Sequence, residues 1–321
     1  MINSLRTFLA HKVKSNKSKI NHGGFTLIEL LVAMIVAVLI IAPLLRFMIT
    51  VLDTDRKEQA KTTSEQEIQA AIDYIARDLE QAVYIYDDSG IHNEIPPLAG
   101  TNGCNPKNNC KPVLVFWKRK YFDREDQKVD VNGKNRKIGD LTEGNDTFVY
   151  ALVAYYLIEE KTDWLDIGKI GRFEIHDKVI SLAPKEAADI PASKGFKSFN
   201  LSEPGNTLKD KLNQWTKGDA AYDTPVQTLV NYIDISPEED NQNNQQNNCP
   251  NDNYLQVPEK SEDGFYVCVD SKNKIAQLVL RGNALARITT NEKQYNFLKK
   301  QSSYFPTVTM QVEGRGFLNI K

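Results

Sequence analysis

The segment FTLIELLVAMIVAVLIIAPLL, from Phe25 to Leu45, is an unbroken apolar run of 21 residues in which Glu29 is the one charged side chain. At about 1.5 Å per residue, a helix of this length spans about 31 Å, the thickness of the hydrocarbon core of a bilayer. The 24 residues before it carry five basic side chains and no acidic ones. By the positive-inside rule, this arrangement predicts a cytoplasmic amino terminus and an extracytoplasmic remainder of the chain.

Two ordinary explanations of this segment are a secretory signal peptide and a plain membrane anchor. A signal peptide has an apolar region of roughly 7–15 residues and an A-x-A-like cleavage site. The run here is longer, and no such site lies near its end. A plain anchor fits the length but leaves Glu29 unexplained, because a carboxylate in hydrocarbon costs a few kcal/mol.

The residues at the start of the run carry a more specific motif, Gly23-Gly24-Phe25-Thr26-Leu27-Ile28-Glu29. It closely resembles the processing site of type IV pilins and type II secretion pseudopilins. The resemblance includes the basic leader, seven contiguous positions and the long apolar helix. It implies that a prepilin peptidase in the inner membrane cuts between Gly24 and Phe25 and then methylates the amino group of Phe25. It also implies single-pass insertion in the inner membrane and later assembly into a periplasmic or surface filament.

The chemistry of the motif agrees with that resemblance. Gly24 has no Cβ, so it can extend into a protease cleft without a steric penalty. Cleavage would leave a positive amine on Phe25, and Glu29 follows one helical turn later. In the resembling families this carboxylate pairs with the terminal amine of a neighbouring subunit, and we expect Glu29 to act in filament assembly.

Helical periodicity continues beyond the apolar run as a stripe of apolar residues at three- and four-residue steps. The stripe comprises Ile68, Ala71, Ile72, Ile75, Leu79, Ala82, Val83 and Tyr86. This spacing predicts an amphipathic helix. We therefore expect a transmembrane part at residues 25–52 and a stalk at residues 53–86, forming one helix from Phe25 to about Tyr86. Pro43 removes a backbone donor and predicts a kink or local unwinding. Alternatively, Ser64 and Glu67 form a capping box that divides the stalk near Thr62.

Over residues 87–321 the helical pattern gives way to short runs rich in β-branched and aromatic residues. Turns that contain Gly, Asn and Asp bound these runs. Strands are predicted at Pro112–Lys120, Thr147–Glu159, Gly264–Asp270, Ile275–Arg281 and Phe305–Val312. Gln227–Ile235 is ambiguous between strand and helix. A mainly antiparallel sheet packed on the long helix gives an α+β fold, which is also the plan of pilin-like proteins.

The head region also contains an Asn/Gln-rich segment and four cysteines. Residues 241–253 hold ten Asn or Gln residues among thirteen, so we expect an exposed loop there. Cys104 and Cys110 lie in one loop, and Cys249 and Cys268 bracket another. An oxidising compartment favours two local disulfides within these pairs, although the sequence permits three pairings.

Catalytic, metal and cofactor motifs are not found in the sequence. Residues 1–24 contain two of the four histidines, and His92 and His176 are far apart. We expect no enzyme, no cofactor and no metal site. Asp140, Glu143 and Asp146 are interpreted as a solvated acidic turn rather than a calcium loop. A formal charge of -2, with no basic footprint, argues against a nucleic-acid partner. The cationic run from Lys118 to Lys120, beside Phe116, Trp117 and Tyr121, suggests contact with nucleic acid or an acidic polymer. The snorkelling end of a strand explains the run equally well.

A finer resemblance is carried by TDRKEQAKTTSEQEIQAAIDYIARDLEQAVYIYD (Thr54–Asp87) and PVLVFWKRK (Pro112–Lys120). These stretches are similar to the C-type pseudopilin of cyanobacterial hormogonium polysaccharide secretion. The resemblance implies a minor pseudopilin that supports polysaccharide secretion and gliding motility. Its partners would be other pilins or pseudopilins, prepilin peptidase and the inner-membrane assembly platform. The alternatives are an adhesive minor type IV pilin and a J-type minor pseudopilin of a protein secretion system. Glu29 argues against the tip position, because tip subunits typically lack this acid.

Overall fold

The fold is described from a computed structural model. It describes residues 24–92, 95, 104, 110–122, 128–131, 134–137, 147–161, 166–179, 190–236, 249–259, 264–288 and 296–318. The chain divides into two compact units, Met1–Thr54 and Asp55–Lys321. The first unit contains the apolar part of the long helix, and the second contains the sheets.

One long helix, α2 (Leu27–Leu79), begins two residues after Phe25 and continues through Pro43. Thr26 caps it, because the backbone N–H of Glu29 donates to Thr26 Oγ1 at 3.3 Å and to the Thr26 carbonyl oxygen at 3.1 Å. In the part of the chain that the structure describes, α2 is the one helix long and apolar enough to cross a membrane. The side chains from Leu27 to Leu52 are exposed, as expected of a segment whose apolar surface meets lipid or another subunit.

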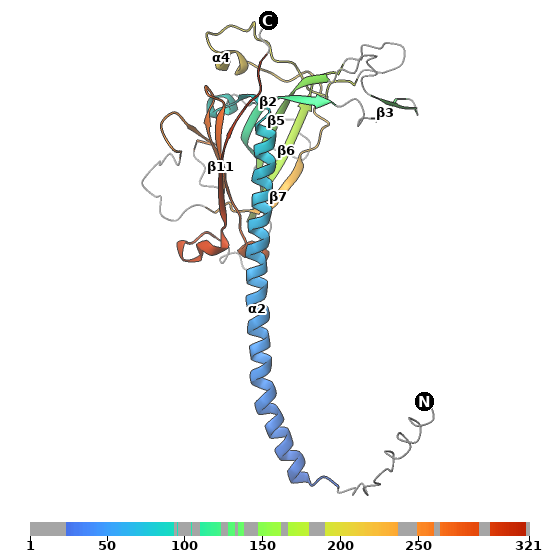
Figure 1. Ribbon diagram of the computed structural model, residues 1–321, viewed down its shortest axis with the longest axis vertical. Helices are drawn as coiled ribbons and strands as arrows, with labels where there is room; N and C mark the ends of the chain where they lie inside the picture. The colour runs from blue at the N-terminus through green and yellow to red at the C-terminus, as the bar shows by residue number, and fades with distance from the viewer. Residues whose placement is uncertain are drawn as a thin grey trace, which may run out of the picture. The chain divides into compact units, whose positions relative to one another are not determined.

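Two antiparallel sheets form most of the second unit (Figure 1). The larger has the order β1 (Ala82–Ile85), β2 (Cys110–Phe122), β5 (Thr147–Lys161), β6 (Asp166–His176), β7 (Gln227–Ile233). The smaller has the order β11 (Thr307–Glu313), β10 (Ile275–Arg281), β9 (Phe265–Asp270), β8 (Leu255–Val257). A separate hairpin pairs β3 (Lys128–Val131) with β4 (Lys134–Lys137). The short helices are α3 (Asp88–His92), α4 (Leu208–Leu212), η2 (Leu285–Arg287) and η4 (Lys299–Tyr304).

The main hydrophobic core lies between the second half of α2 and both sheets. The predicted stripe supplies the contribution of the helix, and Ile72, Ile75 and Leu79 are completely buried. A second cluster covers the opposite face of the larger sheet around Trp117, Phe173 and Trp215. Because the larger sheet is covered on both faces, the central residues of β2 read as a continuous apolar run rather than an alternating one.

Backbone contacts join the two sheets at two places. At the first, Asp234 N donates to Arg281 O at 3.0 Å, and Gly264 N donates to Asp234 O at 2.7 Å. At the second, the carboxyl-terminal segment reaches β1, where Gly316 N donates to Ala82 O at 2.9 Å. These contacts close the smaller sheet against the larger one around the shared core.

The predicted α+β arrangement, a long helix followed by an antiparallel head in the pilin-like plan, is confirmed. The predicted end of the helix near Tyr86 is wrong, because α2 ends at Leu79 and Ala82–Ile85 form strand β1. That segment pairs with β2 and buries both of its faces, which a surface helix cannot do. The segment Gln227–Ile235, which was ambiguous between strand and helix, contains strand β7, and this strand ends at Ile233. Strands β1, β3, β4, β6 and β8 were not predicted.

Candidate functional site

The segment singled out from the sequence lies at the very start of α2. Gly24 and Phe25 precede the helix, and Glu29 occupies its first turn. A methyl group added to Gly24 would have no atom within 4 Å, and Phe25 is exposed. The Gly24–Phe25 peptide bond is therefore not enclosed by the described part of the protein.

The structure bears on two further predictions for α2, the effect of Pro43 and the capping box. The helix is continuous through Pro43, so helical structure is not interrupted there, while a kink stays a prediction. The capping-box alternative is wrong, because the helix does not begin near Ser64. Ser64 and Glu67 instead accept from Arg287, whose Nε lies 2.8 Å from Ser64 Oγ. Arg287 thereby ties η2 to α2.

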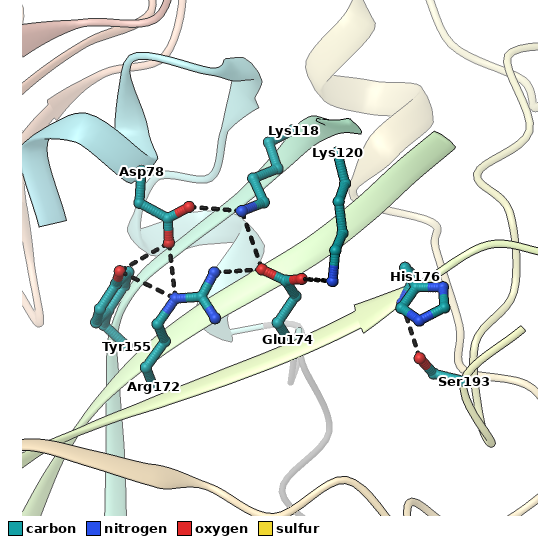
Figure 2. Close-up of polar contacts among 8 residues, drawn as sticks. All are labelled: Asp78, Lys118, Lys120, Tyr155, Arg172, Glu174, His176 and Ser193. Atoms are coloured by element: carbon teal, nitrogen blue, oxygen red, sulfur yellow. Dashed lines mark hydrogen bonds and ion pairs between the residues drawn. The ribbon is translucent and has the colours of Figure 1, made fainter. Parts of the chain in front are cut away.

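A buried polar network joins the last turn of α2 to the larger sheet, as Figure 2 shows. Asp78 Oδ1 accepts from Lys118 Nζ at 2.6 Å, and Asp78 Oδ2 accepts from Arg172 Nε at 2.8 Å and from the Tyr155 hydroxyl at 2.7 Å. Glu174 completes the network. It lies 2.9 Å from Lys118 Nζ, 2.5 Å from Lys120 Nζ, and in contact with the Arg172 guanidinium. The network thus holds two carboxylates and three cations.

The pKa values of the two carboxyl groups follow from these contacts. Burial by itself raises the pKa of Asp78, but the hydrogen bond from Arg172 and the charges of Lys118 and Arg172 lower it below its usual value. Burial opposes ionisation of Glu174 as well, and the charges of Lys118, Arg172 and Lys120 lower its pKa strongly. Both groups are therefore ionised at neutral pH and in mild acid. An acid at a helix carboxyl terminus opposes the helix dipole, and the cations offset that cost.

Sequence reasoning missed this network and misread Lys118. Lys118 is buried between two carboxylates, so the interpretation of Lys118 as a snorkelling cation is wrong. A usable signal was present, because Asp78 is three residues after Ile75 and therefore lies on the same side of the helix as the predicted buried stripe. A buried carboxylate requires a cationic or hydrogen-bonding partner, and the alternation of β2 puts Lys118 and Lys120 on one face.

A cleft of about 380 Å³ adjoins the network. It is lined by Lys120, Arg172, Glu174, His176, Ser193, Thr224, Pro225 and Gln227. His176 N donates to Ser193 Oγ at 3.0 Å, a contact that fixes the end of β6 against the following segment. The cleft is polar, and its lining includes both cationic and anionic side chains.

The remaining predicted positions are distributed over the head. Cys104 is bonded to Cys110, and Cys249 is bonded to Cys268. Of the Asn/Gln-rich segment, residues 250–253 are exposed bends and turns, and residues 241–248 lie outside the described residues. Asp140, Glu143 and Asp146 also lie outside them. Among the residues that the structure describes, no group of three or more His, Cys, Asp or Glu side chains is placed to hold a metal ion.

An apolar helix of membrane-spanning length followed by an antiparallel head gives the described part of the chain a pilin-like α+β architecture. Residues 19–45 match the family described as "Prokaryotic N-terminal methylation motif". "Pilin-like protein PilA3" of Thermus thermophilus is 32% identical over 84 residues, which is 25% of this chain and 36% of that protein. The matched region therefore spans about a third of that relative. No solved structure matches the chain. The motif and the relative support a type IV pilin-like protein.

Proposed function

We propose that the protein is a minor pseudopilin, a structural subunit of a type IV pilus or type II secretion-like filament. The observation that carries this proposal is the position of the Gly24–Phe25 bond. It lies outside the capped end of α2, directly before an exposed apolar helix that requires a lipid or protein environment. Prepilin peptidase cuts this bond and methylates Phe25, and the cytoplasmic leader is removed.

The head supports a minor rather than a repeating role. It follows a long helix and carries about 235 residues, a large volume for a subunit that repeats along a filament. Its two sheets and two disulfides suit an extracytoplasmic, oxidising location. We assign residues 25–52 to the membrane and residues 53–79 to the stalk helix, and the head begins with strand β1. The plasma membrane therefore holds the subunit by one span until the filament is assembled.

Processing provides the direct test. The full chain is expressed with and without a prepilin peptidase, and the amino terminus is determined by mass spectrometry. We expect a chain that begins with methylated Phe25 only when the peptidase is present. Gly24→Val should block the cut, and because nothing surrounds Gly24, its head should melt at the wild-type temperature. Cleavage at another bond, or efficient cleavage of Gly24→Val, would contradict the proposal.

The finer proposal is that the filament supports polysaccharide secretion and gliding motility. It rests on the resemblance of Thr54–Asp87 and Pro112–Lys120 to a hormogonium pseudopilin. Deletion of the gene should abolish both extracellular polysaccharide and motility. Retained polysaccharide with lost surface attachment would indicate an adhesive minor pilin. Loss of an exported protein with normal polysaccharide would indicate a J-type pseudopilin.

A further inference from the structure

The cleft beside the buried network has the size of a small ligand site. Ligand pockets usually enclose about 300–1,000 Å³, and the cleft of about 380 Å³ is near the lower limit. It is built from the ends of β2, β6 and β7 and from the segments containing Ser193 and Thr224. Figure 2 shows Lys120, Glu174, His176 and Ser193 on this side of the network.

The charges around the cleft favour an anion. Both oxygens of Asp78 and both oxygens of Glu174 already accept from a cation. Three cations face these two carboxylates, so the network carries one net positive charge. Lys120 has the most exposed side chain of the three, at 29% against 8% for Lys118 and 13% for Arg172. Its ammonium group has three N–H donors, so it can bind a further acceptor at the mouth of the cleft.

The neutral residues that line the cleft favour a ligand that carries hydroxyl groups as well. Ser193 Oγ accepts from His176 N, which leaves the hydroxyl proton free to donate. His176 Nδ1 lies 2.8 Å from the carbonyl oxygen of Asp177. A carbonyl can only accept, so Nδ1 carries the proton and Nε2 is an acceptor when the ring is neutral. Thr224 and Gln227 add further donors and acceptors.

We propose that this cleft binds an acidic sugar of the uronate type. The carboxylate would lie at Lys120 and Arg172, and the ring hydroxyls would bond to Ser193, Thr224 and Gln227. An acidic peptide fits less well, because protein partners usually insert apolar or aromatic side chains, and Pro225 is the one apolar residue in the lining. This inference does not depend on the place of the subunit in a filament.

The test uses the full chain in detergent and trigalacturonate as the probe, with calorimetric titration at low salt. Low salt is needed because exposed charges are screened over about 10 Å at 0.1 M ionic strength. We expect saturable binding of trigalacturonate and none of the neutral trisaccharide maltotriose. Lys120→Gln should weaken binding about tenfold, the usual effect of losing a charged hydrogen-bond donor. Thr224→Ala, outside the ion network, should weaken it about threefold.

Lys169→Gln is the matched control. Lys169 lies on β6 of the same sheet, is 28% exposed and pairs with Glu160, but it does not line the cleft. We expect Lys169→Gln to bind trigalacturonate with the affinity of the wild type. The proposal is overturned if trigalacturonate does not saturate, if Lys120→Gln and Thr224→Ala bind normally, or if Lys169→Gln binds as weakly as they do. Equal binding of triglutamate with the same Lys120 dependence would also overturn it, and would assign the cleft to an acidic protein partner.

Discussion

Arg172 Nε donates to Asp78 Oδ2 across 2.8 Å, which joins the last turn of the long helix to strand β6 of the larger sheet. Both side chains are largely buried, and each has further partners of opposite charge. The contact fixes the helix end against the sheet at the point where the chain turns into β1.

Removal of Asp78 should destabilise the head strongly. Asp78→Ala leaves Lys118 and Arg172 buried without one of their two carboxylates, and loss of one partner from a buried pair costs about 3–5 kcal/mol. The measurement is urea unfolding of the full chain in detergent, followed by the fluorescence of the buried Trp117 and Trp215. Asp73→Ala, a partly exposed acid on the same helix, should change the free energy of unfolding by less than about 0.5 kcal/mol. Equal stability of both variants would contradict a structural role for the network.

Acid should weaken the head through Glu174. Its pKa is lower in the folded protein than in the unfolded chain, where a glutamate titrates near about 4.3. The stabilisation is therefore complete above that pH and is lost as the pH falls toward the folded pKa. Glu174→Gln should be less stable than wild type at pH 7 and should lose less stability between about pH 5 and pH 3. Parallel stability curves would refute this assignment, and Glu80→Gln, at an exposed site, should follow the wild type.

The carboxyl-terminal closure requires glycine at position 316. A Cβ there would lie 2.6 Å from Val83 Cγ1 and 2.7 Å from the backbone oxygens of Gln81 and Ala82. Backbone oxygens cannot move aside as a flexible side chain can, so Gly316→Ala should cost about 1–3 kcal/mol. Thermal unfolding measures this effect. Gly24→Ala, at a position with open space, should melt at the wild-type temperature.

The two disulfides should differ in their contributions. Cys249 and Cys268 are 19 residues apart, whereas Cys104 and Cys110 are six apart. Because the longer loop has more conformational entropy to lose, Cys249→Ala/Cys268→Ala should cost about 3 kcal/mol and Cys104→Ala/Cys110→Ala about 2 kcal/mol. Urea midpoints of the two double variants check the order. Mass spectrometry of non-reduced peptides should recover only these two pairings.

Glu29 should act in assembly and not in processing. Glu29→Ala leaves the Gly24–Phe25 bond and the Thr26 cap unchanged, since the cap uses the backbone N–H of residue 29. We expect normal cleavage and at least a tenfold loss of the subunit from purified filaments, because a charge pair in an apolar environment cannot be replaced by water. Glu65→Ala, an exposed acid further along α2, is the control. Wild-type incorporation of Glu29→Ala would remove Glu29 from the assembly mechanism.

Much of the fold could be read from local patterns. The apolar run and the stripe from Ile68 to Leu79 predicted α2, because a helix that meets lipid or a core on one side shows that requirement in its own sequence. The strands β2, β5, β9 and β10 were found for a similar reason, since their β-branched and aromatic content is concentrated. Strand β6 was missed because Gly168, Gly171 and four charged residues dilute that signal.

Local sequence by itself determined that this chain has one membrane-length helix, a pilin-like amino terminus and a β-rich head. Those features depend on residues that are neighbours in the chain, and helix geometry links them over a few turns. The tertiary structure decided where the helix ends, because Ala82–Ile85 become a strand only when β2 is beside them. It also decided the polar network and the cleft. Asp78, Lys118 and Arg172 are separated by dozens of residues, and a buried charge is stable only where the fold brings its partners together.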